Sequence, residues 1–181
     1  MDPNDRPRSG LATDQPATSD TASALANATE ILARAAADEA AAVEAHARFR
    51  REGAPTLPPD ERISPLLEPG ERVIAVRHAV LLDRREPAPG ARFTPGVAGT
   101  LYVTSQRLVL VGRLTLPFAI DEIEDAIVTG ERLLLVLRDG HGVALQVAQP
   151  RLLWVEIAAA RGPARAGQGS GSKDGPRPAV R

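Results

Sequence analysis

The middle of this chain alternates apolar and polar residues in short runs, and turn-forming residues separate these runs. A period of two is typical of β-strands with one face on a core and the other toward solvent. The pattern extends over about residues 71–147 and accommodates seven strands with short connections. Short connections join antiparallel neighbours, so the sequence predicts an antiparallel sheet.

The first predicted hairpin lies in GTLYVTSQRLVLVG, residues 99–112. A two-residue bend after Thr104 places Val103 opposite Leu108 and puts both side chains on one side of the sheet. Thr104 and Arg107 flank this bend, where their polar groups can satisfy backbone groups that the strands leave unpaired. We therefore predict a structural role for both residues. The alternative is that Arg107 contacts an acidic partner.

The second predicted hairpin, over residues 132–147, contains Asp139-Gly140, a pair suited to a tight type I′ turn. A bend of two or four residues places Leu134 in register with the core residues of the next strand and turns the alternate leucines outward. An outward row of leucines indicates a cover from the same chain or a contact with a second molecule. The predicted protein-interface residues are Leu133, Leu135 and Leu137.

The segments flanking the sheet differ from it in composition. Residues 1–22 have almost nothing to bury and predict a disordered tail. Residues 23–52 are rich in Ala, Glu and Arg and predict a separate helix with a narrow apolar stripe. The Pro-rich stretch 53–65 predicts a linker before a folded domain over 66–161. Residues 162–181, rich in Gly, Pro and Arg, predict a flexible tail.

A second helix is predicted at the end of the folded domain. Pro150 suits a first helical position and Gly162 suits the position after the last turn. Leu153, Trp154 and Ile157 recur on one face between them, so this helix has an apolar stripe that can cover the sheet.

Several segments of the domain carry a resemblance to a known family. The pattern G-x-L-y-x-T-x-x-R-L is matched by Gly99, Leu101, Tyr102, Thr104, Arg107 and Leu108. The other segments are LLEPGERVIA, LPFAIDEIEDA and DGHGVALQV, together with Trp154 in the final helix. Through them the chain resembles the pleckstrin-homology-like (PH-like) superfold, in particular the bacterial PH-like and GRAM-like families, over about residues 66–161.

The resemblance implies a mainly β, α+β fold. Its seven-stranded antiparallel sheet bends into a partly open barrel, which the C-terminal helix caps. A structural role for Trp154 in that helix is implied as well. The resemblance further implies a noncatalytic binding or scaffold module that mediates protein-protein assembly, through self-association or a protein partner.

Composition limits the chemistry of the chain. The 22 basic and 23 acidic residues leave a net charge of −1, which gives no global attraction to nucleic acid. The absence of cysteine excludes disulfides, thiolate nucleophiles and cysteine-based zinc sites. The three histidines lack neighbouring ligands at metal spacing. We therefore expect no enzyme activity, no metal or other cofactor, no small-molecule substrate and no nucleic-acid partner.

The alternative function is that of a peripheral membrane reader. The loop over residues 83–96 combines basic and aromatic side chains, which suit weak contact with anionic lipid, although Asp83 and Glu86 cancel much of the charge. The candidate lipid-contact residues are Arg84, Arg85, Arg92 and Phe93. Without a signal-like start or a run of about 18 apolar residues, we expect a cytoplasmic protein, or one peripheral at the membrane.

Overall fold

The structure, a computed structural model, describes residues 17–85 and 94–162. The chain divides into two compact units, residues 1–36 and 37–181, and the boundary lies within helix α1 (Ala17–Glu52). In the first unit, the described residues are helical, and Leu25, Ile31 and Leu32 are 59–70% exposed. The helix begins at Ala17, within the predicted tail, so its start lies six residues before the predicted one.

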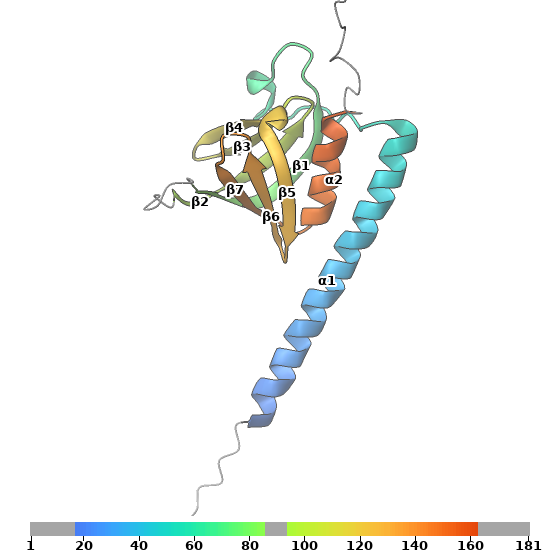
Figure 1. The fold of residues 1–181 in the computed structure, drawn as a ribbon, viewed down its shortest axis with the longest axis vertical. Helices are drawn as coiled ribbons and strands as arrows, with labels where there is room; N and C mark the ends of the chain where they lie inside the picture. The colour runs from blue at the N-terminus through green and yellow to red at the C-terminus, as the bar shows by residue number, and fades with distance from the viewer. Residues whose placement is uncertain (1–16, 86–93, 163–181) are drawn as a thin grey trace, which may run out of the picture. The chain divides into compact units, whose positions relative to one another are not determined.

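The second unit contains a seven-stranded antiparallel sheet and the helix α2 (Pro150–Ala160) (Figure 1). The strands follow the order β4-β3-β2-β1-β7-β6-β5, so β4 and β5 form the two edges. This arrangement is the PH-like α+β fold that the sequence predicts. The strands are β1 (Val73–Arg85), β2 (Thr94–Thr104), β3 (Arg107–Gly112), β4 (Thr115–Ala119), β5 (Ile123–Thr129), β6 (Arg132–Leu137) and β7 (Gly142–Gln146).

Strand β1 connects the two halves of the sheet. It pairs with β2 along most of its length and with β7 from Leu81 to Arg85. A β-bulge interrupts its pairing with β2 between Arg77 and Val80, and Ala79 within this bulge has a φ of 54°. A bulge bends the strand and increases its twist, which suits a strand shared by both halves.

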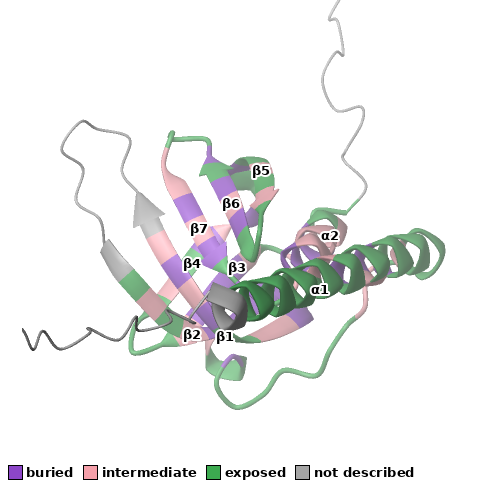
Figure 2. Ribbon diagram, turned by 90° about the horizontal axis from the view of Figure 1, so that it is seen from below, coloured by how far each residue is buried: buried purple, intermediate pink, exposed green. Residues whose placement is uncertain are grey.

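The main core lies between the concave side of the sheet and α2. The first hairpin has the predicted register, with Val103 opposite Leu108, and both side chains are almost fully buried. From α2, Leu153 and Ile157 enter the same cluster with no exposed surface. Figure 2 shows the buried positions alternating with more exposed ones along the strands, as the period-two pattern requires.

The predicted outward row of leucines on β6 is wrong. Val136 on this strand faces outward with 38% of its surface exposed. Leu133, Leu135 and Leu137 belong to the main core, and the first two pair with buried residues of β7. Their exposed fractions are 0%, 2% and 4% for Leu133, Leu135 and Leu137.

The turn between β6 and β7 explains this error. The Leu137 N–H donates to the His141 carbonyl at 2.9 Å, which closes a loop of three residues instead of two or four. Gly140 has a φ of 83°, the left-handed conformation that ends such a three-residue loop. An odd number of loop residues shifts the register by one and reverses which side chains enter the core.

The segment that we interpreted as a linker packs on the convex side of the sheet. Ile63 is fully buried against Val73, Tyr102 and Val109, which form a second, smaller cluster. The 3₁₀ turn η1 (Ser64–Leu66) follows directly and Leu66 joins this cluster. We call residues 54–70 the strap, because they cover the outer face of β1, β2 and β3.

A hydrogen bond fixes the strap to β2. The Tyr102 hydroxyl donates to Asp60 Oδ2 at 2.7 Å, and Asp60 Oδ1 accepts the N–H groups of Arg62 and Ile63. Burial and this hydrogen bond raise the pKa of Tyr102 to about 12. The hydrogen bond from Tyr102 also lowers the pKa of Asp60, so this pair stays phenol and carboxylate at neutral pH.

Candidate functional site

A groove of about 900 Å³ opens in the second unit. It is surrounded by the last turns of α1, the start of β1, the bend between β2 and β3 and the last turns of α2. The apolar part of its lining includes Phe49, Ile74 and Val155. Its polar part consists of the imidazole of His46, two arginines, Arg50 and Arg72, and one carboxylate, Glu52.

The end of α1 brings two basic side chains to the groove. The helix stops at Gly53, which has a φ of 82° and donates its N–H to the Phe49 carbonyl at 2.9 Å. Arg50 therefore lies in the last turn, where a cation interacts favourably with the helix dipole. His46 precedes it by four residues and lies on the same side of the helix.

A buried aspartate on α1 caps the start of α2. Asp38 is 3% exposed, and its carboxylate accepts the N–H groups of Arg151 at 2.9 Å and of Leu152 at 3.1 Å. These are first-turn donors, which a helix cannot satisfy internally, and Gln149 before them provides no side-chain cap. Asp38 thereby fixes the position of α2, which forms one wall of the groove, relative to residues 37–52 of α1.

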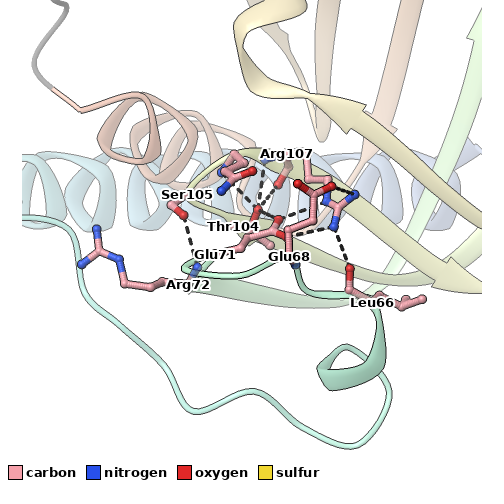
Figure 3. A network of polar contacts seen from close by, with 8 residues as sticks. Leu66, Glu68, Glu71, Arg72, Thr104, Ser105 and Arg107 are labelled. Atoms are coloured by element: carbon pink, nitrogen blue, oxygen red, sulfur yellow. Dashed lines mark hydrogen bonds and ion pairs between the residues drawn. The ribbon is translucent and has the colours of Figure 1, made fainter.

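A polar network positions the opposite wall (Figure 3). Arg107 forms a two-pronged ion pair with Glu71, with Nε at 3.1 Å and Nη2 at 2.9 Å from the carboxylate oxygens. The same guanidinium contacts Glu68 at 3.1 Å and donates to the Leu66 carbonyl at 2.6 Å. The network joins the strap to the bend between β2 and β3.

Thr104 completes this network. Its hydroxyl donates to Glu71 at 2.5 Å and accepts the N–H groups of Gln106 and Arg107. Burial alone would raise the pKa of Glu71, but the hydrogen bonds from Arg107, the Glu68 N–H and Thr104 outweigh burial and lower it. Glu71 is therefore a carboxylate in a fully satisfied site.

This network places two groove residues. The Ser105 N–H donates to the Arg72 carbonyl at 2.9 Å, and the Arg72 N–H donates to Ser105 Oγ at 3.2 Å. The Arg72 guanidinium is directed away from the network, as Figure 3 shows. Arg72 thus has a fixed backbone and an exposed side chain on the groove.

A second ion pair lies beneath α2. Arg77 on β1 pairs with Glu156 on α2, but Arg77 Nε and Glu156 Oε2 are buried and have no hydrogen-bond partner among the described residues. Burial raises the pKa of Glu156 to about 7, and the attraction of Arg77 offsets burial only in part. This pair is incomplete, unlike the pair of Glu71 and Arg107.

Trp154, another sequence-predicted residue, is not part of the groove lining. Trp154 packs against the main core, and Arg161 lies 5.6 Å from its ring centre. Arg84 and Arg85 are the last two residues of β1, and nothing is described of their side chains. Arg92 and Phe93 fall outside the described residues. The contact of these four residues with anionic lipid therefore stays a prediction.

The sequence analysis missed the groove residues. One signal was available, because the RFRRE sequence at the end of the first predicted helix places basic residues around Phe49. Nothing in the sequence indicated that Arg72 would join them. In residues 17–85 and 94–162, no cluster of three His, Asp or Glu side chains could hold a metal ion, and no helix is long and apolar enough to span a membrane.

Comparison with known proteins gives likenesses to solved structures. No family model and no curated protein matches this chain. One similar structure is the C-terminal domain of an unknown protein from Leishmania infantum, with a TM-score of 0.37 and 13% identity, covering 50% of this chain and 85% of that chain. Another is the N-terminal PH domain of the human ARAP2 protein, with a TM-score of 0.32 and 14% identity, covering 56% and 93% respectively. The strand order and the C-terminal helix give this chain a PH-like α+β fold.

Proposed function

We propose that this chain is a noncatalytic binding module that assembles with a protein partner through the groove between α1 and α2. The observation that carries this proposal is the combination of an apolar lining with basic side chains that have no ion-pair partner among the described residues. Binding sites commonly combine an apolar surface with a few polar groups that fix the orientation of the ligand.

The contacts of the groove residues support binding over catalysis. Ser105 is a hydroxyl residue on the groove, and its Oγ accepts a backbone N–H from Arg72. A catalytic serine needs a base within hydrogen-bond reach, and no such base is hydrogen-bonded to Ser105 in the described part of the chain. The fixed walls, formed by the Asp38 cap and the Glu71 network, favour a preformed site for a partner.

Site-specific photo-cross-linking in the native cell tests this proposal. A benzophenone amino acid at position 158, an exposed alanine on the groove, should form an adduct with a protein partner. The matched control is the same amino acid at position 114, an exposed leucine in the turn between β3 and β4. Adducts at 158 that disappear in the Val155→Arg variant support the groove, whereas equal adducts at both positions, or none at 158, contradict it.

A further inference from the structure

The charge of the groove differs from the charge of the whole chain. Arg50 and Arg72 are exposed there and have no ion-pair partner within the described ranges. The acidic residue of the groove, Glu52, lies 3.7 Å from Arg51, which also faces solvent. The chain as a whole has a net charge of −1, so the basic character is local to the groove. Such a surface attracts carboxylates and disfavours basic ligands.

The backbone of the groove adds hydrogen-bond acceptors. Arg50 and Glu52 belong to the last turn of α1, and Ala158 and Ala160 belong to the last turn of α2. The last carbonyl groups of a helix have no partner within the helix. A ligand with N–H donors can replace water at these carbonyl groups, in addition to supplying negative charge. A polypeptide supplies both, through its backbone amides and its acidic side chains.

The apolar lining selects a further feature of the ligand. Phe49 and Val155 are half-buried and Ile74 is buried, whereas the α2 side of the groove is formed largely by alanines. Small side chains on one wall leave room for a large apolar side chain of the ligand. A volume of about 900 Å³ is within the range of pockets that hold ligands with several side-chain-sized groups.

We propose that the groove binds a short polypeptide segment in which a large aliphatic or aromatic side chain is flanked by Asp or Glu. This inference rests on the proposed function and names the chemistry of its partner. The apolar side chain contacts Phe49 and Val155, while the carboxylates lie next to Arg50 and Arg72. Contacts between opposite charges at the edge of the site contribute mainly to orientation and to the rate of association.

Selection from a random dodecapeptide library on the immobilised full chain tests this inference. We expect enriched peptides with Leu, Ile, Phe or Trp next to Asp or Glu. Fluorescence anisotropy with the most enriched peptide should show at least tenfold weaker binding to Arg50→Glu/Arg72→Glu. Arg113→Glu/Arg132→Glu, which reverses two exposed arginines elsewhere, should bind normally and controls for net charge.

The outcomes separate this inference from the proposed function. Enrichment of basic or uncharged peptides that Val155→Arg no longer binds would overturn the acidic ligand and leave the groove as a binding site. Enriched peptides that bind Val155→Arg as well as the original chain would overturn both. Failure of the selection, together with binding to phosphatidylglycerol vesicles that Arg50→Glu/Arg72→Glu abolishes, would overturn the polypeptide and indicate a lipid ligand.

Discussion

Two buried glutamates in this domain, each paired with an arginine, have different surroundings. Glu71 accepts hydrogen bonds at both carboxylate oxygens, from Arg107, from Thr104 and from the Glu68 N–H. Glu156 pairs with Arg77 through one oxygen, while the other oxygen is buried without a partner among the described residues. The two pairs differ in how completely their oxygens are satisfied.

This difference decides the protonation of each carboxyl group. Burial disfavours the charged form in both cases, and hydrogen bonds to the charged form oppose burial. The pKa of Glu71 is lowered because its hydrogen bonds outweigh burial, whereas burial raises the pKa of Glu156 to about 7. Glu71 therefore stays ionised and links the strap to the sheet through its hydrogen bonds. Glu156 titrates near neutral pH.

The largest effect is expected from breaking the complete pair. Arg107→Met leaves the Glu71 side chain, which has no exposed surface, without its cation. Removing one partner of a buried pair costs about 3–5 kcal/mol, so we expect this loss in the free energy of unfolding measured by urea denaturation at pH 7. Arg113→Met, at an exposed position, should change it by less than about 0.5 kcal/mol. A loss below about 1 kcal/mol in Arg107→Met would show that the network does not stabilise the strap.

The next effect concerns pH and distinguishes the two glutamates. The native state raises the pKa of Glu156 from an ordinary value of 4.5 to about 7, so it binds this proton more tightly than the unfolded state does. The stabilisation is therefore complete below about pH 4.5 and is lost as pH rises through 7, with a total of about 3 kcal/mol. The lowered pKa of Glu71 acts in the opposite direction, with stability lost as pH falls below its unfolded value.

Urea denaturation between pH 5 and 8 measures the contribution of Glu156. The original chain should lose stability across this range, whereas Glu156→Gln, which has no proton to release, should show a flatter profile. Glu124→Gln, at an exposed position on β5, serves as the control and should retain the original slope. An unchanged slope in Glu156→Gln would mean that Glu156 does not titrate in this range.

An intermediate effect is expected at the cap that Asp38 provides. Asp38→Ala removes the acceptor for two N–H groups of α2 and should lower the free energy of unfolding by about 1–2 kcal/mol. Hydrogen exchange at Arg151 and Leu152 should become faster in the same variant. Glu39→Ala removes an exposed ion pair to Arg151 and should cost less than about 1 kcal/mol. Equal effects of the two variants would contradict the capping role.

The sequence predicted those elements whose determinants are local. The register of the first hairpin followed from alternation on both sides of a two-residue bend. The second hairpin failed because Asp139-Gly140 is compatible with more than one loop length, and Gly140 ends a loop of three residues. One residue in loop length reversed the orientation of every leucine on β6. Local patterns therefore predict strands better than they predict which face of a strand is buried.

The groove is formed by residues that are far apart in the sequence, and no local pattern encodes their contacts. It combines the end of α1, the start of β1, the bend at Ser105 and the end of α2. The strap escaped prediction for a related reason, since its Pro-rich composition resembles a linker while Ile63 alone provides its buried anchor. Residues that act through isolated long-range contacts, such as Asp38 of α1 at the start of α2, leave no periodic signal in the sequence.

The smallest expected effect tests whether the incomplete pair is coupled to strain in β1. Ala79 has a φ of 54° two residues after Arg77, in a backbone conformation that costs a residue with a Cβ about 1 kcal/mol or more. Ala79→Gly should therefore raise the free energy of unfolding by about 0.5–1 kcal/mol, whereas Ala98→Gly, in regular extended β2, should lower it by a similar amount. A decrease in the free energy of unfolding of Ala79→Gly would show that the bulge is not strained.

The pH profile of the same variant tests the coupling. If Ala79→Gly is more stable and keeps the original pH profile, the strain at Ala79 is independent of the incomplete hydrogen bonding of Glu156. A flatter profile would mean instead that the bulge holds Arg77 in the position that leaves the pair incomplete.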